Sequence, residues 1–201
     1  MSLSRFVLLL VVFVSGCIGY TTREFSAGSI SSEHNILVDK DGYFVFEGTR
    51  LKISPSNDKI QEIGIFPIPF SHNIDVKKLN YFDVDMMIKV AGNKNSIKLN
   101  NVIYIPLGGE KIRPARYFGP YDCTKIVAAK SGLSEKNVDD IPIHLQSDMT
   151  NCFRVSYSAE TPSASETFYF KLEGAISDGK IIDIPLITFT KEILSHVVAV
   201  P

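Results

Sequence analysis

FDVDMMIKV, residues 82–90, places apolar side chains at every second position from Phe82 to Val90, with Asp83, Asp85 and Lys89 among the residues between them. Side chains alternate between the two faces of a β-strand, so this period of two predicts a strand with one buried face and one solvated face. No other segment of the chain shows the pattern as clearly. The segment therefore predicts a half-buried strand of a β-protein.

The same alternation continues beyond a turn signal at residues 92–95. The apolar residues that follow share one parity, which predicts a long hairpin with Lys98, Asn100 and Tyr104 on its outer face; they are Ile97, Leu99, Ile103, Ile105 and Leu107. A second hairpin is predicted around Asp178-Gly179 and a third around Asp41-Gly42, because these dipeptides favour tight turns between apolar runs.

Further strands are predicted over residues 51–53, 60–66, 141–146 and 153–157, which makes roughly ten in all. Helical periodicity is confined to residues 124–130. The sequence thus predicts an all-β fold with at most one or two short helices, a β-sandwich of immunoglobulin-like type formed as a single domain by residues 35–201. Closure of the strands into a barrel is an open alternative, because short strands separated by turns suit both architectures.

The N-terminal residues 1–16 have the features of an export signal. Arg5 precedes an apolar run from Phe6 to Val14, which has the charge and length of a signal-peptide core. A membrane-spanning helix needs about 20 apolar residues, so this run is too short to span a bilayer. Residues 1–16 are therefore predicted to be a signal peptide.

The end of this segment carries a specific processing pattern. Val14, Ser15, Gly16 and Cys17 resemble the lipobox of bacterial lipoproteins, in which an aliphatic residue and two small residues precede the acceptor cysteine. The resemblance implies that Cys17 carries acyl chains such as palmitate and becomes the mature N-terminus, which would anchor the protein stably to a membrane. Ile18 in place of aspartate favours, by resemblance to Gram-negative sorting, the periplasmic side of the outer membrane over the inner membrane. A secretory signal that happens to end in cysteine is the alternative.

Residues 17–34 are polar and rich in serine, which predicts a lipidated, flexible tether between the anchor and the folded domain. The whole chain has 21 basic and 22 acidic residues, and a balance so near neutrality gives no reason to expect a nucleic-acid partner. The partners predicted are the membrane, through Cys17, and an envelope protein.

The two remaining cysteines, Cys123 and Cys152, are predicted to form a disulfide because export delivers them to an oxidising compartment. Such a bond closes a loop of about 30 residues and stabilises the fold by roughly 3 to 4 kcal/mol on a chain-entropy model. Free thiols or a redox pair are the alternatives, and the spacing does not form a CxxC motif.

No motif in the sequence predicts a catalytic or cofactor site. The four histidines are dispersed, and no cofactor or metal is expected. An enzyme would need a site built from distant residues, for which His72, Asp83 and Asp85 are the candidates, because Asp83 and Asp85 share one strand face at a spacing near that of two-carboxylate hydrolases. Exposed strand faces commonly carry such pairs without function.

The most distinctive stretch is residues 113–123, which combines arginines, aromatic residues and prolines. It is a candidate partner-binding loop, because arginine and tyrosine are enriched at interface hot spots; the candidate contacts are Arg113, Arg116, Tyr117, Phe118 and Tyr121. The favoured interpretation is a covering loop that packs its aromatic side chains onto the end of the sandwich.

These patterns together predict a non-enzymatic, lipid-anchored protein of the bacterial cell envelope with a binding or assembly role. Two other classes remain open. One is an envelope hydrolase or carbohydrate-active protein with a dispersed site. The other is a small-ligand carrier, which predicts an apolar cavity between the sheets.

Overall fold

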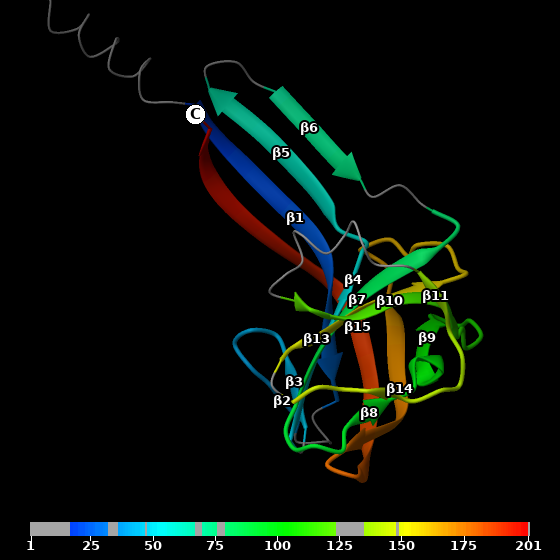
Figure 1. The fold of residues 1–201 in the computed structure, drawn as a ribbon. Coiled ribbons are helices and arrows are strands. Elements are labelled where there is room, and N and C mark those ends of the chain that lie inside the picture. The colour runs from blue at the N-terminus through cyan, green and yellow to red at the C-terminus, as the bar shows by residue number, and fades with distance from the viewer. Residues whose placement is uncertain are drawn as a thin grey trace, which may run out of the picture.

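The computed structural model describes residues 17–31, 36–46, 48–66, 70–75, 79–123, 135–147 and 149–200. These residues form strands joined by turns and one short 3-10 helix, η2 (Leu99–Asn101) (Figure 1). The strands are β1 (Cys17–Ile30), β2 (Leu37–Val38), β3 (Phe44–Phe46), β4 (Thr49–Pro55), β5 (Lys59–Phe66), β6 (Phe70–Asp75), β7 (Phe82–Val90), β8 (Ser96–Ile97), β9 (Val102–Pro106), β10 (Pro114–Asp122), β11 (Lys136–Asn137), β12 (Ile143–His144), β13 (Asn151–Tyr157), β14 (Phe168–Ser177) and β15 (Lys180–Val200).

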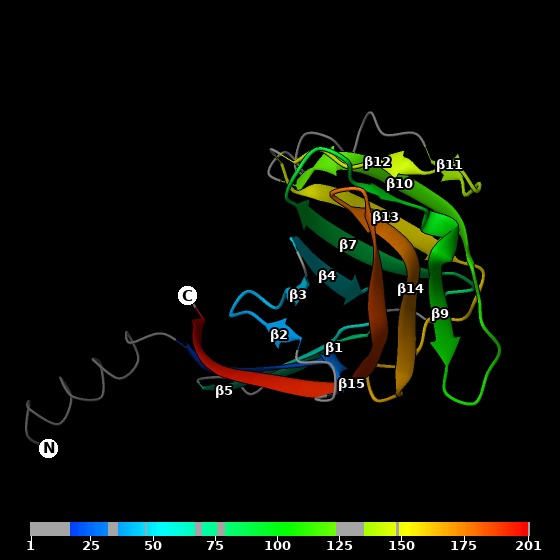
Figure 2. The same cartoon turned by 90° about the horizontal axis from the view of Figure 1, so that it is seen from below.

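The strands form two antiparallel sheets. In the first sheet the order is β12-β8-β14-β15-β1-β5-β6, with β9 also paired to β14. In the second the order is β11-β10-β13-β7-β4-β3-β2. Figure 2 shows the two sheets enclosing the interior of the body. The predicted all-β, sandwich-like fold is confirmed, whereas its immunoglobulin-like subtype stays a prediction.

The core lies where the apolar face of β7 meets the first sheet. Burial along β7 alternates as its sequence predicts, and Phe82, Val84 and Met86 are fully buried. Phe82 packs edge-on against Phe168, with ring centroids 5.8 Å apart, and Phe168 stacks on Phe189 at 5.2 Å. Each such aromatic pair adds about 0.5 to 1.5 kcal/mol beyond the apolar area that it buries. This cluster holds the two sheets together.

The predicted long hairpin over residues 82–107 is wrong, because β7 belongs to the second sheet while β8 and β9 belong to the first. The turn between them carries the chain from one layer to the other. Asn95 holds this turn: its side-chain amide donates to the carbonyl oxygen of Gly92 at 2.8 Å, and its side-chain oxygen accepts the Asp178 N–H at 2.8 Å. Asn95 is only 1% exposed.

Tyr104 also differs from its predicted place on an outer face. The 3-10 turn η2 interrupts the alternation between Leu99 and Val102, so the parity of the following strand is reversed. Val102 and Tyr104 consequently point into the core and are buried, whereas Leu107 is exposed.

The other two predicted hairpins are confirmed. Strands β14 and β15 pair around Asp178-Gly179, both of which adopt positive φ as a tight turn requires. Strands β2 and β3 pair around the turn that contains Gly42, where the Asp39 carboxylate accepts N–H groups of Asp41 and Tyr43 at 2.9 and 3.0 Å. Burial raises the pKa of Asp39, but these bonds and Arg50 outweigh burial and hold the pKa below its ordinary value.

The predicted flexible tether is wrong for residues 17–30, which form β1. This strand pairs with β15 along its whole length and with β5 from Ile18 to Glu24. Its partners lie far along the chain, so a polar sequence typical of a linker becomes a sheet strand through non-local pairing. The predicted signal peptide, residues 1–16, and the predicted helix, residues 124–130, lie outside the described residues.

The predicted disulfide is present between Cys123 and Cys152, whose Cα atoms are 5.4 Å apart. Cys152 belongs to β13, and Cys123 directly follows β10, which pairs with β13. The bond therefore links the ends of two neighbouring strands of the second sheet.

Candidate functional site

Part of the first sheet extends beyond the body as a four-stranded arm, which we define as residues 17–24, 59–66, 70–75 and 190–200. Figure 1 shows β5, β6 and the outer parts of β1 and β15 running away from the sandwich, and Figure 2 shows no second sheet over their far end. Residues 190–197 are all exposed, although strand side chains alternate between two faces. Both faces of the arm are thus solvated along this strand.

The pairing register arranges the arm's side chains in rows across neighbouring strands. Val197 lies opposite Tyr20, and Tyr20 lies opposite Ile63, so these three form one apolar row. They are 74%, 37% and 37% exposed, respectively. On the other face, Leu194 and Ile74 are also exposed. Contiguous apolar side chains left exposed on a folded protein are typical of interaction surfaces.

The arm has an unpaired strand edge. Pairing of β15 with β14 ends at Phe189, which lies opposite Phe168, while pairing with β1 continues to Val200. Among the described residues, Thr190–Val200 therefore has a strand partner on one side only. Unpaired N–H and C=O groups along such an edge are a template for another strand.

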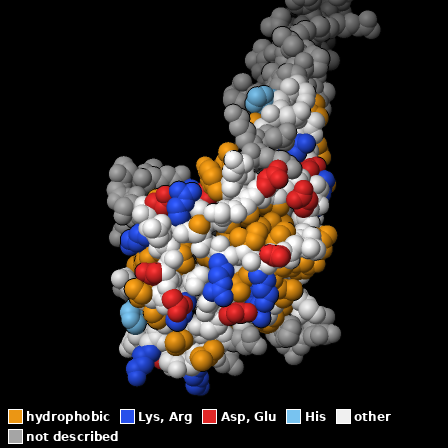
Figure 3. Space-filling view, turned by 90° about the vertical axis from the view of Figure 1, so that its right-hand side faces the viewer, with side chains coloured by type: hydrophobic (Ala, Val, Ile, Leu, Met, Phe, Trp, Pro, Cys, Tyr) orange, Lys and Arg blue, Asp and Glu red, His pale blue; other side chains and the backbone are white. Residues whose placement is uncertain are grey.

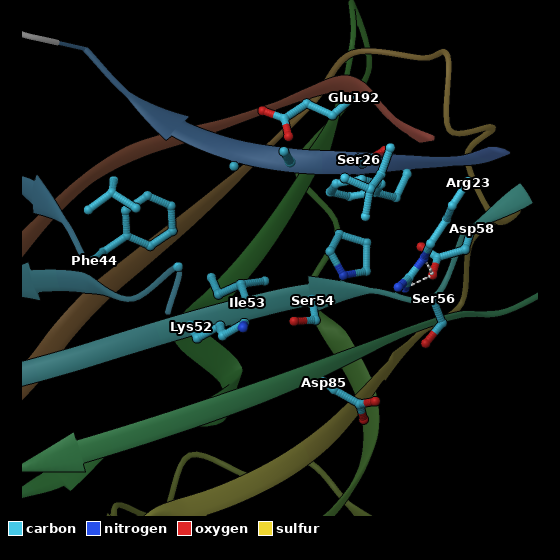
Figure 4. A pocket seen from close by; sticks show the side chains of 17 residues that line it. Arg23, Ser26, Phe44, Lys52, Ile53, Ser54, Ser56, Asp58, Asp85 and Glu192 are labelled. Carbon is cyan, nitrogen blue, oxygen red and sulfur yellow. Dashed lines mark hydrogen bonds and ion pairs between the residues drawn. The ribbon is translucent and has the colours of Figure 1, made fainter. Parts of the chain in front are cut away.

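A groove of about 740 Å³ lies at the base of the arm, where the two sheets diverge (Figure 4). Strand β5 pairs with β1 as far as Glu24, but β4, which precedes β5 in the chain, turns into the second sheet. The groove is bordered by residues 25–28 of β1 and residues 52–55 of β4. In these segments β1 is paired only to β15 and β4 only to β7, within the described chain.

An Arg–Asp ion pair lies at one end of this groove and an aromatic residue lies at the other (Figure 4). Arg23 Nε donates to Asp58 Oδ2 at 2.8 Å, and the Arg23 guanidinium lies 5.6 Å from the centroid of the Phe25 ring. Phe44 lines the opposite end. Polar side chains, including Ser54, Ser56 and Glu192, line the groove together with the apolar ones, so its wall is mixed in character.

The groove's inner wall depends on a close approach at Gly28. A Cβ atom added there would lie 2.9 Å from a ring carbon of Phe189 and 3.0 Å from one of Phe44. Nearby, Ser26 Oγ accepts a hydrogen bond from the Asn57 side-chain amide at 2.9 Å. Gly28 allows β1 to lie against the core, and the Ser26–Asn57 bond fixes the crossing from β4 to β5.

The predicted partner-binding loop is wrong in form, because residues 114–122 are strand β10. Its prolines occupy positions that a strand tolerates: Pro114 is the first residue, and Pro120 lies at an irregularity in the pairing with β13. Alternation then separates the candidate contacts. Arg116 is exposed and pairs with Glu135 at 2.9 Å, whereas Tyr117 faces inward and is 9% exposed.

The other three candidates are also spread along the strand. Arg113 is exposed, and Phe118 and Tyr121 are half-buried. Burial raises the pKa of Tyr121, and the neighbouring Asp85 raises it further. Four of the five residues share strand β10, which Arg113 directly precedes, and the five do not form one exposed surface.

The residues considered for a hydrolase site are not brought together. His72 lies on β6 in the first sheet, whereas Asp83 and Asp85 lie on β7 in the second. Asp83 accepts a hydrogen bond from Ser156 at 2.6 Å, and Asp85 accepts two from Arg154, both at 2.8 Å. The bond to Asp85 raises the pKa of Arg154. Both carboxylates therefore join β7 to β13.

The cavity expected of a small-ligand carrier is not found between the sheets in the described part of the chain. The apolar space recorded there has a volume of about 10 Å³, and is lined by core residues such as Leu51, Leu172 and Ile184. The aromatic cluster fills the interior. The described residues also contain no group of three or more His, Cys, Asp or Glu able to hold a metal ion.

The visible surface in Figure 3 carries charges of both signs, interspersed with apolar side chains that gather on the body below the arm. Among the described residues, no helix has the length and hydrophobicity needed to cross a membrane. Comparisons of the chain with protein-family models, with curated proteins and with solved structures found no match.

The arm and its groove were not predicted from the sequence. A usable signal was present in residues 193–200, where apolar residues occupy both parities of the strand period while charged residues precede them. A strand apolar on both faces is typical of full burial. The position of this strand beyond the second sheet, which the sequence does not show, leaves residues 193–197 exposed.

Proposed function

We propose that this chain is a lipid-anchored protein of the bacterial cell envelope that binds or assembles with an envelope protein without catalysing a reaction. In this proposal acyl chains on Cys17 hold the protein at the periplasmic side of the outer membrane. The observation that carries the proposal is the arm: a solvated sheet with apolar rows and an open edge, whose strand β1 begins at Cys17.

The arm offers a rigid connection between the anchor and the body. Cys17 to Glu24 span eight residues of a strand that is paired on both sides from Ile18. At about 3.3 Å per residue, this places the body roughly 25 Å along the sheet from the lipidated residue. A paired strand has far less conformational freedom than a serine-rich coil, so the surfaces of the body keep a fixed geometry relative to the anchor.

A binding role is favoured over the two other classes by the state of their candidate sites. Asp83 and Asp85, the carboxylates that a hydrolase would need, are hydrogen-bonded to Ser156 and Arg154. The space between the sheets, which a small-ligand carrier would need as a cavity, is filled by aromatic side chains. The exposed apolar rows and the groove between strand edges, by contrast, are surfaces that a second polypeptide can cover.

The anchor is tested by metabolic labelling with palmitate in a bacterial host, comparing the parent chain with Cys17→Ala. The parent is expected to carry label and to sediment with membranes, whereas the variant should carry none and leave the membrane fraction. The Cys123–Cys152 pair is unchanged in both chains, so a folding defect would appear separately as loss of the disulfide. Label that persists in Cys17→Ala would contradict the anchor.

A further inference from the structure

We propose that residues Thr190–Val200 of β15 pair antiparallel with the same residues of a second copy of the chain. The pairing joins two arms into one continuous eight-stranded sheet. This pairing specifies the partner in the proposed assembly role. It rests on the proposed anchor only because the anchor would raise the stability of the dimer at a membrane.

The edge carries few of the features that keep natural strand edges from pairing. Proteins protect such edges with prolines, bulges, short length or charged side chains, lysine especially. Here the Lys and Glu side chains are confined to positions 191 and 192, at one end of the segment. Thr190–Val200 contains neither proline nor glycine, and its register with β1 is continuous over all eleven residues. Of its charged residues, Lys191 is already held by Glu24 at 3.0 Å. Ile193 and Val197 lie on one face and are 57% and 74% exposed.

A second copy fits this edge because the segment is self-complementary. A two-fold axis through Ser195 would use all eleven residues of each copy. That register places Ile193 opposite Val197, so apolar residues meet across the axis on one face. On the other face it places Leu194 opposite His196.

The charges also agree with this register. Lys191 comes opposite Ala199, and Glu192 comes opposite Val198, so no like charges face each other. Registers centred on Lys191 or Glu192 would instead place two lysines or two glutamates face to face, which is destabilising, and would use fewer residues. The register centred on Ser195 is therefore the favoured one.

The geometry of this dimer suits two anchors in one membrane. The two-fold axis is perpendicular to the joined sheet, so both copies of Cys17 lie in one plane parallel to that sheet, at opposite ends of the seam. A bilayer parallel to the sheet can receive both sets of acyl chains.

The size of the contact predicts where the dimer forms. Eleven residues extend roughly 36 Å, and a sheet is about 10 Å thick, so the seam buries on the order of 700 Å² in total. Stable complexes usually bury at least about 1,200 Å². The pairing is therefore weak in free solution, and confinement of both copies to a membrane raises their effective concentration.

The test is a cysteine crosslink in native membranes. Ser195→Cys places two thiols across the axis, while Thr22→Cys is the matched control: Thr22 lies directly opposite Ser195 on β1, one strand further from the seam. Under a mild oxidant, Ser195→Cys is expected to give a disulfide-linked dimer at least about ten-fold more abundant than that of Thr22→Cys or of the parent chain. Equal yields in the three chains overturn the pairing.

The register is tested by a charge exchange in the Ser195→Cys background. Val197→Glu alone is expected to reduce the dimer several-fold, because it places a charge opposite Ile193 of the second copy. Adding Ile193→Lys should restore the dimer, since the two new charges meet only across the seam and residue 193 lies opposite Glu24 within its own chain. Failure of the second change to restore the crosslink overturns this register.

Palmitate labelling of the same samples separates the two proposals. A dimer without label supports the pairing and contradicts the anchor, whereas label without a dimer overturns the pairing and leaves the anchor intact. A Ser195→Cys crosslink to a different protein, in place of the dimer, overturns the assignment of a second copy.

Discussion

Gly28 is the residue on which the packing of β1 against the core most directly depends. A Cβ at this position would overlap ring carbons of Phe189 and Phe44, both of which are buried. Because overpacking of a filled core costs about 1 to 3 kcal/mol, Gly28→Ala is expected to lower the free energy of unfolding by that amount. Urea denaturation measures the change.

The matched control for Gly28 is Ser29→Ala, one residue further along β1 on the opposite, exposed face. Its effect should stay within about 0.5 kcal/mol, as is usual for surface substitutions. If both variants unfold at the urea concentration of the parent chain, the close approach at Gly28 does not limit stability.

At the scale of elements, the crossing between the sheets after β7 depends on Asn95. Asn95→Ala would remove the part-buried hydrogen bonds to the Asp178 N–H and to the Gly92 carbonyl. Each such bond contributes about 0.5 to 1.5 kcal/mol net, so we expect a loss of about 1 to 3 kcal/mol in the free energy of unfolding.

Asn93→Ala is the control for Asn95, since Asn93 lies in the same turn but is exposed. Thermal unfolding of the two variants should separate them clearly, with Asn93→Ala close to the parent chain. Similar melting temperatures for both variants would show that solvent replaces the lost hydrogen bonds.

The elements that sequence patterns predicted well are those whose partner is close in the chain. Asp178-Gly179 and the turn at Gly42 specify hairpins locally, and β7 shows its buried face in its own alternation. The predictions that failed needed non-local information. The turn at Asn95 bonds to a residue 83 positions away, and β1 is paired with a strand at the other end of the chain.

The candidate site escaped prediction for the same reason. Exposure of Val197 and Ile193 follows from where the second sheet stops, which no local pattern encodes. The stretch from Pro114 to Asp122 was predicted to be a loop because of its prolines, but one begins the strand and the other lies at an irregularity in its pairing. Residue type alone did not distinguish these positions from a loop.

At the scale of the whole molecule, the aromatic core makes stability depend on alkaline pH. Burial, with a smaller contribution from Glu166, raises the pKa of Tyr104 to about 12, and burial raises that of Tyr157 well above its usual value. Unfolding returns both phenols to about 10. Their neutral forms therefore stabilise the fold fully below pH 10, and this contribution is lost as pH rises through the folded values.

For Tyr104 alone this shift corresponds to at most about 3 kcal/mol, less the screening by solvent near its hydroxyl, lost between pH 10 and pH 12. Denaturant midpoints measured from pH 8 to pH 12, with tyrosinate absorbance recorded alongside, test this expectation. Tyr104→Phe should show a shallower decline above pH 10. A Tyr104 phenol that ionises near pH 10 in the folded protein would contradict it.

The register that sets Cys17 opposite Val200 has a mechanical consequence. Tension that pulls Cys17 away from the body runs along β1, and so loads its hydrogen bonds to β15 and β5 in shear, many at once. A force that pulls Cys17 and Val200 apart, perpendicular to the strands, would instead break the hydrogen bonds between β1 and β15 one after another. Under the proposed anchoring through Cys17, a pull on the body would load this sheet in the direction in which it is strongest.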